Sequence, residues 1–92
     1  MTATPETNAH VTIFATEWCP FCAKLRKNLD RTETPYDLVD VEGKGNEEAA
    51  AWVESVNDGN RVVPTVLYSD GTHATNPAAS AVREKFAELA EA

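Results

Sequence analysis

Apolar positions along the chain change their period several times, which predicts a succession of strands and helices. Residues 11–14 are β-branched and aromatic, as in a buried strand. Further on, Cys22, Leu25 and Leu29 recur at steps of three and four, which predicts one apolar face of a helix. The Thr34-Pro35 pair should end this helix, because the residue before a proline is disfavoured in helical conformation.

A second strand and a second helix are predicted next. In the strand, at residues 36–41, Leu38 and Val39 are adjacent rather than alternating, which indicates that both strand faces are covered. Asn46 is placed to cap a helix whose first turn carries two glutamates, at the positive end of the helix dipole. The predicted buried stripe of this helix consists of Ala49, Trp52, Val53 and Val56.

The last third of the chain predicts a hairpin followed by a helix. An extended segment at residues 61–68 leads into a turn at 69–71 and a short strand at 72–74. Asn76 is expected to cap the final helix, with Pro77 at the first helical position. The apolar face of that helix consists of Val82, Phe86 and Leu89.

The predicted order is therefore strand, helix, strand, helix, strand, strand, helix. The first strand-helix-strand unit implies a parallel pair with a right-handed crossover, and the hairpin adds antiparallel strands. We expect an α/β fold with a mixed four-stranded sheet and helices on its faces. Residues 1–9 are predicted to be a flexible tail, and residues 10–92 one domain.

Composition excludes several classes of function. The chain has 92 residues and a formal net charge of -7, which disfavours binding to nucleic acid or to anionic membrane surfaces. It contains no apolar stretch long enough to span a bilayer and no signal-peptide pattern at residues 1–8. We therefore expect a cytoplasmic protein, most simply a monomer.

The two cysteines, Cys19 and Cys22, carry the candidate chemistry. They lie where the first strand gives way to a helix, and Pro20 suits the first helical position, so Cys19 is the predicted N-cap. The unpaired amides of a first turn stabilise a thiolate, and helix N-termini and Cys-x-x-Cys motifs lower a thiol pKa from about 8.5 to roughly 3.5–7.5. Cys19 is therefore the predicted nucleophile. Cys22, on the apolar face, should be more buried and less ionised.

The main alternative for a Cys-x-x-Cys pair is half of a zinc site. Such a site needs two further ligands, and the chain offers only His10 and His73, far apart in sequence. Cysteines in a reducing compartment also rarely form structural disulfides. Thiol redox chemistry is the interpretation that the motif favours, without a bound metal or cofactor.

The residues around this motif resemble a known family. Trp18-Cys19-Pro20-Phe21-Cys22, followed by Val63-Pro64-Thr65, resembles the glutaredoxin branch of the thioredoxin fold. More narrowly, Trp18 with the segments 56–66 and 70–77 resembles the mycoredoxins, small redoxins that use mycothiol in place of glutathione. The resemblance implies that Pro64 is a cis proline facing the cysteines, with the backbone of Val63 pairing with the substrate.

The chain departs from the glutaredoxin pattern before its last helix. Glutaredoxins carry a Gly-Gly there, ahead of amides that hold a glutathione carboxylate, whereas residues 72–77 have no Gly-Gly and Pro77 removes one donor. Mycothiol carries a sugar and an inositol instead of that carboxylate, so Thr75 and Asn76 would suit its hydroxyls. The predicted substrate contacts are Trp18, Pro20, Phe21, Arg61, Val63, Pro64, Thr75 and Asn76.

Some of these residues have a second interpretation. Trp18 could stack on a bound sugar or dock a partner protein, and Arg61 could line the cleft or be a solvated loop residue. Lys24 and Lys27 could add positive potential near Cys19, or simply form a solvated helix face.

The resemblance predicts an enzyme that reduces mycothiol mixed disulfides on proteins by a monothiol mechanism through Cys19. Mycothiol is then a diffusible co-substrate, and its partners are mycothiolated proteins and, indirectly, a mycothiol disulfide reductase using NADPH. Two alternatives remain. One is a dithiol hydrogen donor to ribonucleotide reductase, recharged by thioredoxin reductase. The other is a dimer bridging an iron-sulfur cluster through Cys19, which Pro20 would crowd.

Overall fold

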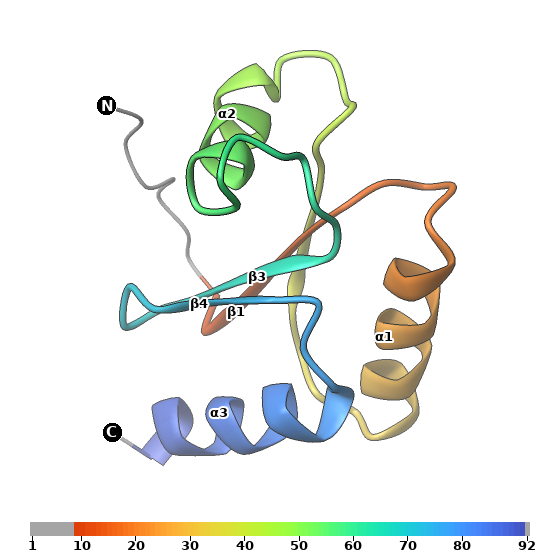
Figure 1. Ribbon diagram of the computed structural model, residues 1–92. Coiled ribbons are helices and arrows are strands. Elements are labelled where there is room, and N and C mark those ends of the chain that lie inside the picture. Colours follow the sequence, from red (N-terminus) through yellow and green to blue (C-terminus); the bar gives the residue numbers. More distant parts are fainter. Residues whose placement is uncertain (1–8, 92) are drawn as a thin grey trace.

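Four strands form one mixed sheet in the order β2-β1-β3-β4 in the computed structural model, which describes residues 9–91 (Figure 1). β1 runs parallel to β2 and antiparallel to β3, and β3 runs antiparallel to β4. The strands are β1 (Val11–Ala15), β2 (Asp37–Asp40), β3 (Thr65–Tyr68) and β4 (His73–Thr75). The predicted α/β, thioredoxin-like architecture is confirmed.

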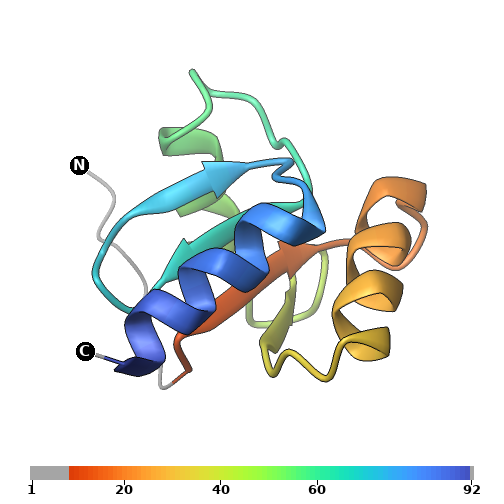
Figure 2. The ribbon, with the colours of Figure 1, turned by 90° about the horizontal axis from the view of Figure 1, so that it is seen from below.

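Three helices cover the two faces of the sheet. They are α1 (Pro20–Arg31), α2 (Glu47–Ser55) and α3 (Ala79–Glu91). α1 and α3 lie on one face and α2 on the other, as the edge-on view of Figure 1 shows; Figure 2, seen from below, has α3 in front of the strands. The crossover from β1 through α1 to β2 supplies the parallel pair.

Strand alternation divides the core into two parts. Val11, Ile13 and Ala15 of β1 pack with the buried residues of α1 and α3, whereas Phe14 packs with those of α2. A sheet sandwiched between helices needs apolar residues on both faces of its central strands, which is why β1 is buried at every position. Trp52 lies in the α2 part, as predicted.

β2 does not have the two covered faces that its sequence predicted. Leu38 is 44% exposed, because β2 is the outermost strand and pairs only with β1. The adjacent apolar pair Leu38 and Val39 was thus a misleading signal: an edge strand can carry an apolar residue that nothing covers.

α1 ends earlier than its sequence predicted. The helix stops at Arg31, and Glu33 adopts a left-handed conformation with φ 56°. The backbone amide of Thr34 then donates to the carbonyl of Leu29 at 2.9 Å, which satisfies an end carbonyl before Pro35 is reached.

Both predicted asparagine caps are wrong in detail. Asn46 stands at the N-cap of α2 but makes no capping bond, because its side chain donates to the carbonyl of Asp40 at 2.9 Å. Asn76 has a φ of 49°, and α3 begins only at Ala79, so Pro77 precedes the helix. The backbone amide of Asn76 instead donates to the carbonyl of Pro64 at 2.7 Å.

The predicted tail at residues 1–9 lies outside the described residues except for Ala9. Between residues 9 and 91, no helix is both long enough and apolar enough to cross a membrane.

Candidate active site

The Cys19 side chain lies at the N-terminus of α1. β1 ends at Ala15, and a short turn carries the chain to Cys19, which has the extended φ and ψ of an N-cap (-78° and 118°). Its sulfur accepts a hydrogen bond from the backbone amide of Cys22 at 3.4 Å. Pro20 occupies the first helical position, where a missing N–H costs nothing. The sulfur therefore accepts from a first-turn amide, which is the position expected of a nucleophilic cysteine at a helix N-terminus.

Cys22 lies one turn further into α1 and cannot ionise easily. Exposure barely separates the two cysteines, at 4% for Cys19 and 1% for Cys22. Burial, together with the hydrogen bond and charge of the neighbouring Cys19, raises the pKa of the Cys22 thiol to about 12. At neutral pH Cys22 is a thiol and a poor nucleophile.

The loop that ends at the cis proline Pro64 contacts the Cys19 side chain. The Val63-Pro64 peptide bond is cis, as the family resemblance implied. The Cys19 thiol donates a hydrogen bond to the carbonyl oxygen of Val63 at 3.7 Å. Residues 44 positions apart are thus in contact at the site.

Asn57 ties together the segments that surround this loop, a role its sequence context did not reveal. Its side-chain amide donates to the carbonyl of Val53 at 2.7 Å and to the hydroxyl of Thr65 at 3.2 Å. Its side-chain oxygen accepts from the hydroxyl of Thr75 at 2.7 Å. Asn57 follows α2 in a stretch of turn-forming residues and lies in the segment 56–66 that carries the family resemblance, but neither signal predicted these contacts.

Two exposed aromatic side chains flank the cysteines. Trp18 is 68% exposed and Phe21 is 61% exposed. The indole N–H of Trp18 donates to a carboxylate oxygen of Glu42 at 2.8 Å, which orients the ring over the loop after β2. Glu42 had no sequence signal for this contact.

Arg61 is engaged away from the cysteines. Its guanidinium forms an ion pair with Glu54 near the end of α2, with an N–O distance of 3.0 Å. Both side chains are exposed enough for water to screen the pair. This places Arg61 closer to the solvated loop residue than to the cleft residue that the sequence also allowed.

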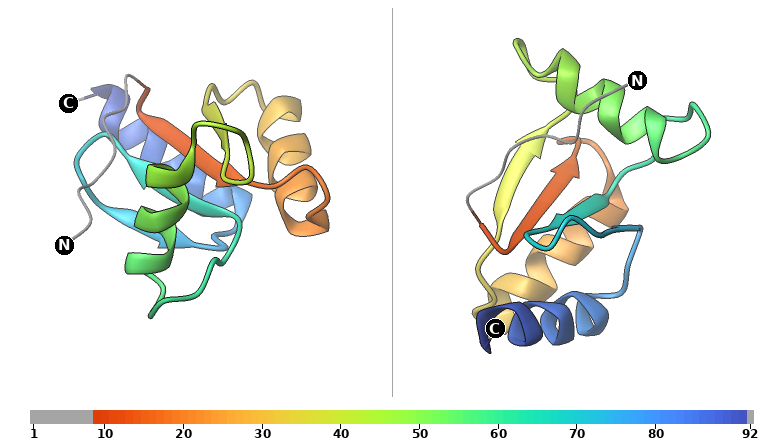
Figure 3. Two further views of the ribbon diagram at one scale, coloured as in Figure 1. Left: turned by 90° about the horizontal axis from the view of Figure 1, so that it is seen from above. Right: turned by 90° about the vertical axis from the view of Figure 1, so that its left-hand side faces the viewer.

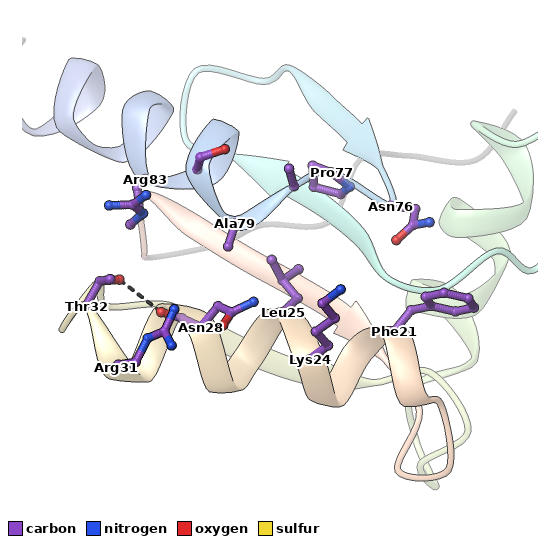
Figure 4. Close-up of a pocket in the computed structure, with 12 residues that line it drawn as sticks. Phe21, Lys24, Leu25, Asn28, Arg31, Thr32, Asn76, Pro77, Ala79 and Arg83 are labelled. Carbon is purple, nitrogen blue, oxygen red and sulfur yellow. Dashed lines mark hydrogen bonds between the residues drawn. The ribbon is translucent and has the colours of Figure 1, made fainter.

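A groove of about 510 Å³ opens between α1 and the start of α3 (Figure 4). Phe21 lies at one end, beside Asn76, and Thr32 and Arg83 lie at the other end. The groove is lined by Phe21, Lys24, Leu25, Asn28, Arg31, Thr32, Asn76, Pro77, Ala78, Ala79, Ser80 and Arg83. Lys27 is exposed but does not line it.

No group of three or more histidine, cysteine or carboxylate side chains in residues 9–91 is arranged to hold a metal ion. The contacts of Cys19 with Cys22 and with Val63 define the candidate site.

Comparison with known proteins agrees with this geometry. The glutaredoxin family model matches residues 11–74, which include both cysteines and the proline loop. The chain belongs to the glutaredoxin family. It is also 61% identical over 82 residues to Mycoredoxin 1 of Corynebacterium glutamicum, covering 89% of this chain and 99% of that protein.

Solved glutaredoxins share the fold. The crystal structure of a glutaredoxin from Methanosarcina mazei Go1 superposes with a TM-score of 0.69 at 26% identity, over 85% of this chain and 78% of that one. The glutaredoxin from Archaeoglobus fulgidus gives a TM-score of 0.65 at 22% identity, over 83% and 84% of the two chains. This glutaredoxin is accordingly a thiol-disulfide oxidoreductase, with the Cys19-Cys22 pair as its redox motif.

Proposed function

We propose that this glutaredoxin reduces mixed disulfides between mycothiol and protein thiols by a monothiol mechanism with Cys19 as the nucleophile. The observation that carries the mechanism is the contrast within the motif. Cys19 faces helix amides, whereas burial holds the pKa of Cys22 at about 12. A second thiol that stays protonated attacks a disulfide on Cys19 only slowly.

The choice of mycothiol is supported by the segment that precedes α3. The amide of Asn76 already donates to Pro64, and Pro77 has no amide hydrogen. Two consecutive backbone donors are therefore missing where a glutathione carboxylate would need them. The 61% identity to a protein named Mycoredoxin 1 points the same way.

The reaction has two exchanges. The Cys19 thiolate attacks the mycothiol sulfur of the mixed disulfide, so that the bond to the protein sulfur breaks and the protein leaves as a thiolate that takes up a proton. A second mycothiol, as thiolate, then attacks the mycothiol sulfur on Cys19. The products are mycothiol disulfide and the regenerated Cys19 thiolate, so the disulfide bond between protein and mycothiol has been exchanged for one between two mycothiols, and one free mycothiol has been consumed.

The residues near Cys19 would position the substrate. The proposed backbone partner is Val63, whose carbonyl oxygen already accepts from the Cys19 thiol. The exposed rings of Trp18 and Phe21, which are close to Cys19 in the sequence, offer apolar contact to the substrate. The hydroxyl of Thr75 donates to Asn57, so it would meet a sugar hydroxyl as an acceptor. Roles for Pro20, Arg61 and Asn76 in binding remain part of the proposal.

The test uses a peptide carrying a mycothiol mixed disulfide, with mycothiol in excess and release of the free peptide thiol as the readout. We expect Cys22→Ser to keep most of the wild-type rate and Cys19→Ser to lose activity by at least about a thousandfold, as for other lost nucleophiles. The same peptide carrying glutathione, with glutathione in excess, should react more slowly with the wild type.

Two results would contradict the proposal. Equal losses in the two serine variants would mean a dithiol mechanism. Faster turnover with the glutathione pair than with the mycothiol pair would mean that mycothiol is not the preferred thiol.

A further inference from the structure

The groove between α1 and α3 has a uniform charge that the two thiol exchanges do not use. Three of its lining residues, Lys24, Arg31 and Arg83, are exposed cations, and none of its lining residues is acidic (Figure 4). The first turn of α3 also lines it, through Ala79 and Ser80, and adds the positive end of a helix dipole. Every electrostatic feature of the groove therefore has the same sign.

This positive groove is unusual for the chain that carries it. The net charge is -7 with only eight basic residues, and three of the eight gather here. Arg61 and Lys85 are ion-paired with carboxylates, whereas within residues 9–91 none of the three groove cations has an ion-pair partner. Unpaired cations around one groove leave a local positive field that an anionic partner would complete.

The groove also has the dimensions of a short extended peptide. It follows α1 from Phe21 to Arg31, and at about 1.5 Å per residue this helical stretch is about 15 Å long. An extended chain rises about 3.3 Å per residue, so four to five residues would fill it. At the Phe21 end of the groove (Figure 4), Asn76 is hydrogen-bonded to Pro64, and the adjacent Val63 accepts from the Cys19 thiol, so this end lies near the nucleophile.

The remaining lining residues suit a polypeptide better than a small anion. Neither Asn28 nor Asn76 makes a side-chain hydrogen bond within residues 9–91, so both amides are available to peptide N–H and C=O groups. Leu25, Pro77 and Ala79 provide apolar contact between them.

We propose that this groove docks an acidic, extended segment of the substrate protein, four to five residues long, next to the disulfide that Cys19 attacks. The inference deepens the proposed function, because it names the feature by which the protein half of a mixed disulfide is recognised. Mycothiol carries no carboxylate that would use these cations, so the charge selects the protein rather than the thiol.

The test compares two peptides that carry the same mycothiol mixed disulfide, one flanked by four glutamates and one by four glutamines. We expect wild type to have a higher kcat/KM for the acidic peptide. In the double variant Lys24→Gln/Arg83→Gln, the ratio of the two kcat/KM values should fall by about tenfold, since each exposed charge pair contributes a factor of a few. Lys44→Gln, which removes an exposed cation outside the groove, is the matched control and should leave the ratio unchanged.

A salt titration of the unmodified protein gives a second, independent measurement. The acidic preference should decline steeply between about 0.05 and 0.5 M salt, because exposed charge pairs are screened. Equal kcat/KM values for the two peptides at low salt, or an equal drop of the ratio in Lys44→Gln, would overturn the docking proposal. If only glutathione adducts react, the proposed function fails, but the peptide ratio can still be measured with those adducts and decides the docking proposal separately.

Discussion

The two faces of the sheet are built from the same four strands but are closed differently. On the α2 face, the ring of Trp52 packs 5.1 Å from the ring of Phe14 and 5.9 Å from that of His73, measured between centroids. Large buried side chains thus seat a single helix against the strands. On the other face, α1 and α3 share the sheet and leave a groove of about 510 Å³ between them.

Figures 2 and 3 show why the second face stays open. α3 lies over the strands with its axis oblique to that of α1, so the two helices do not pack along their whole lengths. The buried residues of α1 and α3 form one cluster with those of β1 and β3. Both faces contain a buried cluster, but only the face covered by α1 and α3 also carries the cysteines and leaves room for a substrate.

The largest expected effect is a loss of unfolding free energy, and it should be greater for a variant on the α2 face than for one on the opposite face. Trp52→Ala should lower the free energy of unfolding by about 3–5 kcal/mol, because a fully buried aromatic side chain leaves a cavity. Phe86→Ala removes a half-buried ring from the opposite face and should cost less. Urea denaturation followed by circular dichroism measures both.

Two further variants serve as controls for this comparison. Trp18→Ala removes an exposed indole and should change stability by no more than about 0.5 kcal/mol. If Trp52→Ala does not fold, Trp52→Phe should still lose more stability than Trp18→Ala. A larger loss of unfolding free energy in Phe86→Ala than in Trp52→Ala would contradict the expectation that the α2 face is the more sensitive to removal of a ring.

A smaller effect on stability is expected at Asn57, which is hydrogen-bonded to residues of α2, β3 and β4. Asn57→Ala removes the donor to the carbonyl of Val53 and to the hydroxyl of Thr65, and the acceptor of the Thr75 hydroxyl, and should cost about 1–3 kcal/mol. Because Thr65 follows the cis proline, kcat/KM should fall as well. Thermal melts and steady-state kinetics measure the two effects.

The isosteric variant Asn57→Asp sharpens this prediction. It keeps the acceptor for Thr75 and loses the donors to Val53 and Thr65, so its loss should lie between those of wild type and Asn57→Ala. Asn60→Ala, which removes one exposed hydrogen bond, is the control and should be nearly neutral. Wild-type stability and kinetics in Asn57→Ala would remove Asn57 from the site.

The smallest effect concerns the ion pair that joins the open face to the hairpin. Lys85 of α3 lies 2.7 Å from a carboxylate oxygen of Asp70, and with Thr72 it holds the pKa of Asp70 well below its usual range. Because the folded-state pKa is below the unfolded value of about 3.9, the pair stabilises the protein above that pH and loses its effect as pH falls toward the folded-state pKa.

The measurement is the difference in unfolding free energy between wild type and Asp70→Asn across pH. We expect a small, constant difference above about pH 5 that shrinks below about pH 4. Added salt should reduce it, since Asp70 is exposed. A difference that grows on acidification would contradict the assigned direction of the pKa shift.

Local sequence patterns predicted much of this molecule. The order of the seven elements, the buried stripes of α1 and α3 and the N-cap position of Cys19 all depend on residues a few positions apart. The same spacing predicted a buried Cys22, and burial does raise the pKa of its thiol, although Cys19 is almost as buried. Helix periodicity and capping are short-range effects, so a short stretch of sequence is enough to specify them.

Where a second partner decides, local patterns were insufficient. Asn46 and Asn76 have the sequence of helix caps, yet Asp40 engages the side chain of the first and Pro64 engages the backbone amide of the second. The sequence around Leu38 predicts a strand covered on both faces, yet the strand order places β2 at the edge of the sheet and leaves Leu38 exposed. In each case another contact or the order of the strands in the sheet outweighed a local preference worth about 1 kcal/mol.

The sequence by itself thus determined the redox motif, the helix that activates it and the family to which the chain belongs. Only the tertiary structure brought Val63 to Cys19, joined Thr75 to Asn57 and gathered Lys24, Arg31 and Arg83 around one groove. The physical reason is that a helix N-terminus is made by neighbours in the chain, whereas a substrate groove is the space left between elements that are distant in sequence.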